Sequence, residues 1–220
     1  MNPPTSLFDA VLQEFSDLRP QVYFKPTLTA LTQAMEDLVL SRDEQPLVIL
    51  SLQREQQYRC SIRRYQQVGQ RSYQTFVLAV PDDVTGFAIA SDPCTTIPLN
   101  SEDALAREWH LLIVSRRYVA GAICRASTTS DLGDEFDWSE RYESVWTFDA
   151  AIVTWAARWM LDRILILRPE LAERVAAAKR DYRLAATAAR PRRSHARQTD
   201  ASAFASRLVT YLQASQYQLL

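Results

Sequence analysis

Side chains that could carry out acid–base or nucleophilic chemistry are few in this chain of 220 residues. Its histidines are His110 and His195, and His195 lies in the basic stretch "RPRRSHARQ". His110, in "EWHLLIV", is more typical of a packed strand residue than of a general base. Carboxylate pairs could be assembled from Glu108, Glu143 and Asp149, but the sequence sets no distance between them. No G-x-S-x-G motif occurs, so we expect a protein without enzyme activity.

The sequence also lacks the patterns that hold phosphates or metals. Its four glycines are scattered singly, whereas a phosphate-binding loop clusters them. Cys60, Cys94 and Cys124 are an odd number without close pairs, which fits neither a zinc site nor a disulfide framework. Cys60 could attach a chromophore through a thioether, although a lone cysteine usually packs as a small hydrophobe. We therefore expect a reducing, cytoplasmic location and no metal, and the sequence identifies no cofactor.

Four tryptophans lie close together in the sequence. Trp155 and Trp159 are four residues apart on one face of a predicted helix, so we expect them to pack against the sheet as core. Trp138 and Trp146 are better candidates for a ligand-binding or light-linked role. Trp138 lies in the polar, acidic stretch "STTSDLGDEFDWSE", where a large aromatic side chain needs cover.

The charge pattern argues against nucleic acid and membrane. The chain has 25 Lys and Arg against 26 Asp and Glu, which leaves a net charge of −1. Arginines near His195 could contact phosphate, but a solvated connector between helices explains them as well. No apolar run reaches the roughly 18 residues of a membrane span, and no secretion signal is present at residues 1–15.

Hydrophobic periodicity predicts alternating helices and strands. Apolar residues recur at helical spacing over 7–18, 28–39 and 54–70, where Gly69 can end the helix. Asp149 caps a further helix that runs to Leu167, and Pro169 can begin the next one. A final amphipathic helix includes Phe204 and Leu212. The strands are expected at 47–52, which is covered on both faces, then 73–80, an edge strand near 95–99, a hairpin of 109–115 and 118–124, and 141–148.

These elements predict an α/β fold of the α+β kind. A mixed sheet of five to six strands is flanked by helices, with an N-terminal helix and a C-terminal helical extension. We place residues 1–168 in the main domain and residues 169–220 in the extension, which contains the basic linker. The single apolar faces of the terminal helices need cover, so we expect them to dock on the core in one state and detach in another.

Four stretches, read in order, resemble the DICT sensory-domain family of diguanylate cyclases and two-component systems: "LTALTQAMEDLVLS", "QREQQYRCSIRRYQQV", "IPLNSEDALAREWHLLIVSRRYVAGAI" and "RYESVWTFDAAIVTWAAR". The resemblance covers about residues 22–163. It implies a signal-input domain in light- or stress-related regulation, of a stand-alone cyanobacterial type. No kinase, cyclase or DNA-binding segment accompanies it in these residues. We therefore expect the output to pass through a protein partner, a homodimer or the terminal helices.

The resemblance also implies the residues of a candidate sensing pocket. The motif residues that carry over are Gln53, Arg54, Glu55, Tyr58, Arg59, Arg107, Glu108, Trp109, Glu143, Trp146 and Asp149. From these, together with Trp138, we take as pocket residues Gln53, Arg54, Tyr58, Arg107, Glu108, Trp109, Trp138 and Trp146. Structural roles stay open for each of them: Arg54 or Arg107 could pair with Glu108 or Glu143, and Trp109 and Trp146 could be core aromatics.

Three functions remain open on the sequence. The first is a sensory protein that passes a signal to a partner through its terminal helices, with a small-molecule ligand as one form of input. The second is a constitutive adaptor or dimerisation scaffold that takes no small-molecule input. The third is an enzyme that uses the Arg and Glu cluster on a small substrate.

Overall fold

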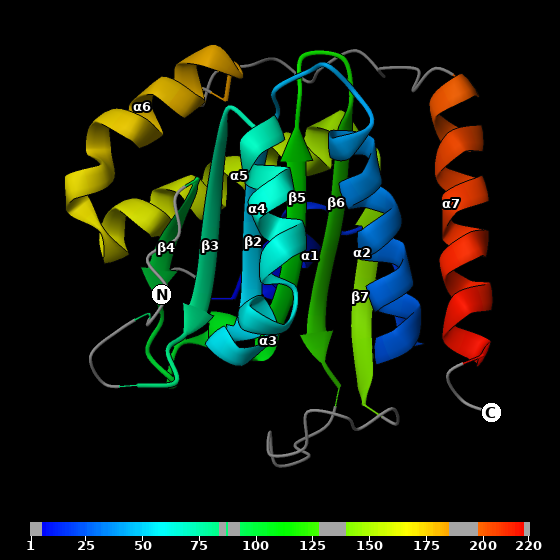
Figure 1. The fold of residues 1–220 in the computed structure, drawn as a ribbon. Helices are drawn as coiled ribbons and strands as arrows, with labels where there is room; N and C mark the ends of the chain where they lie inside the picture. The colour runs from blue at the N-terminus through cyan, green and yellow to red at the C-terminus, as the bar shows by residue number, and fades with distance from the viewer. Residues whose placement is uncertain (1–5, 84–86, 88–92, 128–139, 185–197, 218–220) are drawn as a thin grey trace.

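The computed structural model describes residues 6–83, 87, 93–127, 140–184 and 198–217. Within them, one mixed sheet of seven strands is covered by helices on both faces (Figure 1). This confirms the predicted α/β class, with more strands than the five to six expected. The strand order is β1-β7-β6-β5-β2-β3-β4. The pairs β2–β3 and β3–β4 are parallel, and all the others are antiparallel.

The strands follow the predicted apolar runs, with one addition at the edge of the sheet. Their bounds are β1 Gln21–Phe24, β2 Leu47–Arg54, β3 Gln74–Val80, β4 Cys94–Pro98, β5 Glu108–Val114, β6 Val119–Ala126 and β7 Arg141–Thr147. The run in β2 is buried up to its last residue, which confirms a strand covered on both faces. The β5–β6 hairpin and the edge strand β4 are confirmed as well.

Helices divide between the two faces. One face carries α2 (Lys25–Leu40), α3 (Glu55–Cys60), α4 (Ile62–Arg71) and α7 (Gln198–Tyr217). In Figure 1, α2 and α4 lie in front of the sheet and α7 lies beside α2. The other carries α1 (Leu7–Glu14), α5 (Ala150–Leu167), the 3₁₀ turn Pro169–Leu171 and α6 (Ala172–Asp181). A further 3₁₀ turn, Ala104–Arg107, leads into β5. Each face buries its own hydrophobic cluster.

The C-terminal extension contributes to both hydrophobic clusters. Val175 and Ala178 of α6 are buried in the cluster on the α5 face. Phe204 of α7 is buried in the cluster on the α2 face. The division near residue 168 stays a prediction, and the residues on its two sides share the same cores.

Three local predictions differ from the structure. Residues 54–70 form two helices, because the chain leaves helical geometry at Ser61. The first helix ends at Glu14, whereas the apolar spacing predicted a helix up to residue 18. Trp155 and Trp159 are only partly buried, although both pack against the core cluster as expected. The ring of Trp155 meets that of Phe15, which follows α1, edge to face at 5.9 Å. The predicted cap is confirmed, since Asp149 accepts a hydrogen bond from the amide of Ala151.

Gly69 does not end a helix but lies inside α4, where the absence of a side chain lets β4 approach. A Cβ at this position would lie 2.7 Å from Cγ of Pro93 and 2.9 Å from Sγ of Cys94. The pyrrolidine ring of Pro93 is stiff, so the neighbouring backbone would have to shift. Close packing of the helix on the sheet edge therefore explains the glycine.

Replacing Gly69 by alanine tests this packing. In an open helix the change stabilises by about 1 kcal/mol through helix propensity. Here we expect a loss of about 1–3 kcal/mol from overpacking, measured as the free energy of unfolding in urea. The control is Gln70→Ala, because Gln70 is exposed on the same helix. A stabilised Gly69→Ala variant would contradict the assignment.

Candidate functional site

The residues of the predicted pocket do not converge on one site. Glu108 and Trp109 are consecutive in β5, so their side chains point to opposite faces, Glu108 toward α1 and Trp109 toward the cluster of α2. Arg54 and Arg107 are exposed. The structure therefore does not bring these four residues together, because a strand alternates its side chains.

Trp146 lies near the end of β7, in register with the middle of β5 through Ala122 and Leu111, and its ring contacts are with Phe148 and Phe204. Its side chain is partly exposed, and its Nε1 donates a hydrogen bond to the hydroxyl of Tyr23 at 3.2 Å. Trp138 falls outside the described residues. Neither tryptophan can thus be placed with Trp109 in one pocket.

A smaller group of predicted residues does meet, where β2 and β6 end and β5 and β7 begin. Gln53 is buried at the end of β2, and its Oε1 accepts hydrogen bonds from the Tyr142 hydroxyl at 2.9 Å and from Nε2 of Gln57 at 3.1 Å. The ring of Trp109 packs edge to face on Tyr142 at 5.9 Å. We call Gln53, Gln57, Trp109 and Tyr142 the strand-end cluster. The sequence could not reveal Tyr142 as a member, because it comes from a distant strand.

The strand-end cluster has one unfilled hydrogen-bonding position. Nε2 of Gln53 is buried and has no hydrogen-bond partner among the described residues. Burial raises the pKa of Tyr142 well above its usual value, and nearby Glu140 adds to the shift. Oε1 of Gln53 accepts from both Tyr142 and Gln57, which leaves Nε2 as the spare donor. Such a group suits a ligand that offers an acceptor atom.

Tyr58, the remaining pocket candidate, is buried in the same hydrophobic cluster. Its ring stacks on Tyr65 at 5.5 Å with an interplanar angle of 6°. Phe87 meets it edge to face at 6.4 Å. Tyr58 is therefore part of an aromatic stack that packs α3 and α4 onto the sheet.

Glu108 forms a second buried polar group on the opposite face. Its carboxylate accepts hydrogen bonds from the Ser6 hydroxyl, from the amide of Leu7 at 3.1 Å and from Nε2 of His110 at 2.7 Å. The other ring nitrogen of His110, Nδ1, accepts from the amide of Cys124 at 3.3 Å, so the proton belongs on Nε2. Every contact of the carboxylate is thus with a donor.

This second group has the wrong order for nucleophilic catalysis. A catalytic triad places the imidazole between the hydroxyl and the carboxylate, whereas here the carboxylate of Glu108 lies in the middle. Ser6 also accepts from the amide of Asp9 at 3.0 Å as the N-cap of α1. The group fastens the start of α1 to the sheet. The structural alternative, in which Arg54 or Arg107 pairs with Glu108 or Glu143, is not seen among the described ion pairs, and Glu143 pairs with Arg125 at 2.7 Å.

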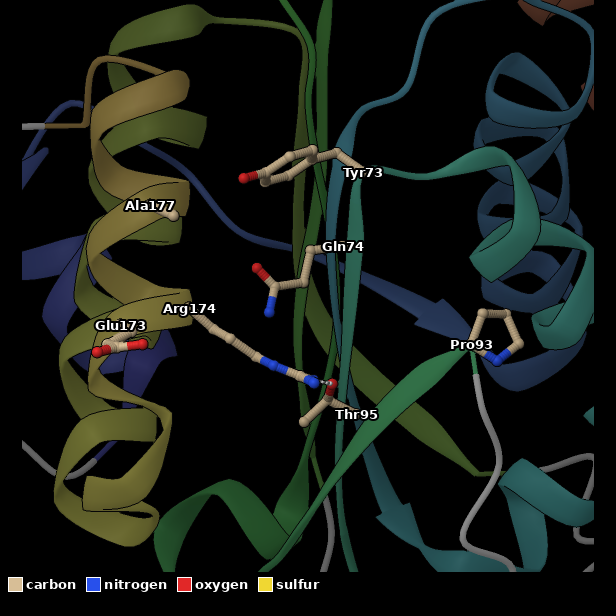
Figure 2. Close-up of a pocket in the computed structure, with 7 residues that line it drawn as sticks. All are labelled: Tyr73, Gln74, Pro93, Thr95, Glu173, Arg174 and Ala177. Carbon is tan, nitrogen blue, oxygen red and sulfur yellow. Dashed lines mark hydrogen bonds between the residues drawn. The ribbon is translucent and has the colours of Figure 1, made fainter.

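A cavity of about 420 Å³ lies at the far edge of the sheet, between α6 and strands β3 and β4 (Figure 2). In it, Nη1 of Arg174 donates to Oγ1 of Thr95 at 3.1 Å. Tyr73, on its wall, donates its hydroxyl proton to Asp181 at 2.9 Å. The sequence pattern contains no signal for this cavity, because its walls come from separate parts of the chain. Glu173 and Arg174 give it both signs of charge, so it selects no class of ligand.

Neither a metal-binding group nor a membrane-spanning helix occurs in the part of the chain that the structure describes. The described residues hold no group of three or more His, Cys, Asp or Glu side chains arranged to bind a metal ion. None of their helices has both the length and the apolar character needed to cross a bilayer.

Two protein-family models match successive segments of this chain. The model of DICT, the sensory domain in diguanylate cyclases and two-component systems, matches residues 5–127, more than half of the chain. The chain belongs to the DICT family. Its role is therefore sensory. A second model, described as the C-terminal domain of a two-partite extracellular sensor domain, matches residues 136–220. No curated protein and no solved structure matches.

The two matched segments build one sheet. Strand β7 belongs to the second segment, yet it pairs with β1 and β6 of the DICT segment on its two sides. Its register joins Tyr23 to Tyr142 and Ala126 to Tyr142. The strand-end cluster likewise takes Gln53 and Trp109 from one segment and Tyr142 from the other. The sensory fold of this chain therefore needs both segments.

The role of Glu108 as an anchor can be tested by Glu108→Ala. The change leaves the hydroxyl of Ser6 and the ring of His110 buried without their acceptor, so we expect a loss of about 2–4 kcal/mol in the free energy of unfolding. Hydrogen exchange in residues 7–14 should accelerate more than exchange in β2. Arg107→Ala is the matched control, since Arg107 is the exposed neighbour. Equal effects of the two changes would refute the anchor.

Proposed function

We propose that this protein receives a signal at the strand-end cluster and passes it along β7 to helix α7, which presents it to a protein partner. One observation carries the proposal. Tyr142 and Trp146 lie on the same face of β7, Tyr142 in the strand-end cluster and Trp146 against α7. A shift of the strand at one end therefore reaches the helix at the other.

The contact between β7 and α7 is aromatic. Phe204 of α7 is buried, and its ring lies 5.0 Å from that of Phe148 and 6.0 Å from that of Trp146. Aromatic pairs of this kind contribute about 0.5–1.5 kcal/mol each beyond the area they bury. Phe204 is thus the main apolar anchor of the described part of α7.

A polar contact holds the middle of α7 against α2. The hydroxyl of Tyr211 donates to Oδ2 of Asp37 at 3.0 Å. Arg64 of α4 binds Oδ1 of the same Asp37 at 2.9 Å and also pairs with the buried carboxylate of Glu36. Burial raises the pKa of Glu36, and the guanidinium of Arg64 opposes that shift. Aromatic contacts at Phe204 and polar contacts at Tyr211 hold α7, and we propose that a few kcal/mol of differential binding releases it.

The input that fits the strand-end cluster is a small molecule with an acceptor atom for Nε2 of Gln53 and a planar or apolar surface for Trp109. A position outside the carboxyl end of β2, next to a parallel neighbour, is where open α/β sheets commonly bind ligands. We place the input in light- or stress-related regulation, as membership of a sensory family supports. Absorption spectra and native mass spectrometry before and after illumination test for a bound chromophore or metabolite.

We further propose that the protein acts in the cytoplasm and is not an enzyme. All three cysteines are thiols, which suits a reducing compartment, although the second matching family is described as extracellular. The exposed side chains of Arg54 and Arg107 lie apart from the anchoring contacts of Glu108, which disfavours a catalytic Arg and Glu cluster. A constitutive adaptor is the second candidate, favoured by the close packing of α7 on the core.

The docking of α7 predicts a clear outcome for Phe204→Ala. Loss of the ring removes the aromatic contact with Trp146 and Phe148, so amide exchange in residues 198–217 should rise about tenfold or more, while exchange in β5 and β6 stays unchanged. Val209→Ala, at an exposed position of the same helix, is the control. If both variants exchange alike, Phe204 does not hold the helix.

Coupling along β7 is tested by Tyr142→Phe. The change removes the hydrogen bond to Gln53 and costs about 1 kcal/mol, and we expect the amides of α7 to exchange faster although Tyr142 does not touch α7 in the described contacts. The control is Tyr58→Phe, a change of the same kind in a tyrosine of the same hydrophobic cluster. A response confined to β2 and β7 would favour the constitutive adaptor.

A further inference from the structure

The two edge strands of the sheet differ in how they are protected from pairing with another chain. At the β4 edge, Nη1 of Arg168 donates to the backbone carbonyl of Thr96 at 2.9 Å, and Pro98 at the end of the strand has no amide proton to offer. Helix α6 also lies beside this edge (Figure 1). Such features keep a strand from pairing with another chain. At the other edge, no strand of the described part of the chain pairs with the outer side of β1.

The outer side of β1 presents apolar side chains and backbone groups from the same two residues. Val22 and Phe24 are 58% and 48% exposed, and both point to the face opposite α2. The amide of Lys25 donates inward to the carbonyl of Glu140 at 3.1 Å. Antiparallel pairing alternates this direction residue by residue. The backbone groups of Val22 and Phe24 therefore point outward, away from β7.

From this geometry we propose that β1 pairs with β1 of a second copy of this chain, antiparallel and centred on Tyr23. In this register Val22 of each copy lies opposite Phe24 of the other, and their outward amides and carbonyls complete four hydrogen bonds. The register also keeps matching faces together, because Val22 and Phe24 have the same parity along the strand. Four exposed apolar side chains then form one cluster across the two-fold axis.

Charges beside β1 complement this arrangement. Arg141 lies opposite Phe24 on β7, with its guanidinium 5.3 Å from the centre of the Phe24 ring, and Glu143 lies opposite Val22. In the dimer, residues that lie opposite one another on the four strands would follow the order Arg141 and Phe24 of one copy, then Val22 and Glu143 of the other. Each such row has an arginine at one end and a glutamate at the other, so no like charges are brought together. This favours a second copy over an unrelated strand.

The pairing should be reversible. Four strand residues from each copy bury less than the roughly 1,200 Å² of a standard stable interface. We therefore expect association to rise with protein concentration, as sedimentation velocity on the full chain would show. In the same series, the amides of Val22 and Phe24 should become protected from exchange as concentration rises. Both measurements use the unmodified chain. A monomer at every concentration, without this protection, would overturn the proposal.

Charge substitutions test the register. Val22→Lys and Phe24→Glu should each weaken association at least about tenfold, because each places a charge against an apolar side chain of the other copy. An equimolar mixture should recover it, since the lysine of one variant lies opposite the glutamate of the other. Ile166→Lys is the control, at a position that is 69% exposed on α5. Failure of the mixture to recover, or an equal loss with Ile166→Lys, would reject this register.

The dimer is separable from the proposed signalling route. It uses β1 alone, so the Phe204→Ala variant should still associate even where α7 is released. Loss of association in that variant would assign the interface to α7 and reject the β1 pairing. Loss of helix protection with association intact would leave the pairing supported.

Discussion

Strand β7 is the element on which the remaining structure depends, because it is hydrogen-bonded on both sides. It joins β1 to β6, and β1 has no other strand partner in the described part of the chain. On the α2 face it places Tyr142 in the strand-end cluster and Trp146 against α7. Without β7 the strand-end cluster loses a hydrogen-bond donor, α7 loses its aromatic contact and β1 loses its place in the sheet.

The two buried polar groups differ in how completely their hydrogen-bonding atoms are satisfied, and this difference bears on which group a ligand would stabilise. The carboxylate of Glu108 would cost several kcal/mol to bury alone, but it has three donors. A group that is already satisfied gains little from a ligand. Gln53 instead keeps a buried donor without a partner among the described residues, a cost of about 1–3 kcal/mol. A ligand that fills this position would recover part of that cost.

Periodicity in the sequence was enough to predict the elements that act locally. The continuous run at 47–52, the hairpin of β5 and β6 and the cap by Asp149 depend on near neighbours, and the structure contains them. Strand β1 was not predicted, because four residues become a strand only through β7. Gly69 was misread for a similar reason, since its neighbour Pro93 is distant in the sequence.

The candidate site was harder to predict than the fold. The sequence pointed to Gln53 and Trp109, which do meet. It also grouped Trp109 with Glu108, its neighbour in β5, whose side chain points to the other face of the sheet. What joins Gln53 to Trp109 is Tyr142, a residue far along the chain. No local pattern marks such a partner. Long-range packing therefore selects the members of the site from a larger set of suitable residues.

Tyr23 links the two proposals physically. Its hydroxyl accepts from Trp146, which touches Phe204 of α7, and it stands at the centre of the inferred two-fold axis. The contact of α7 with Trp146 thus lies one hydrogen bond away from the residue around which two copies would pair, although the pairing itself uses β1 alone. Any coupling between α7 docking and association is reciprocal, and it stays modest if the Phe204→Ala variant still associates. A domain with this layout can send its signal as a change of helix position, of oligomeric state, or of both together.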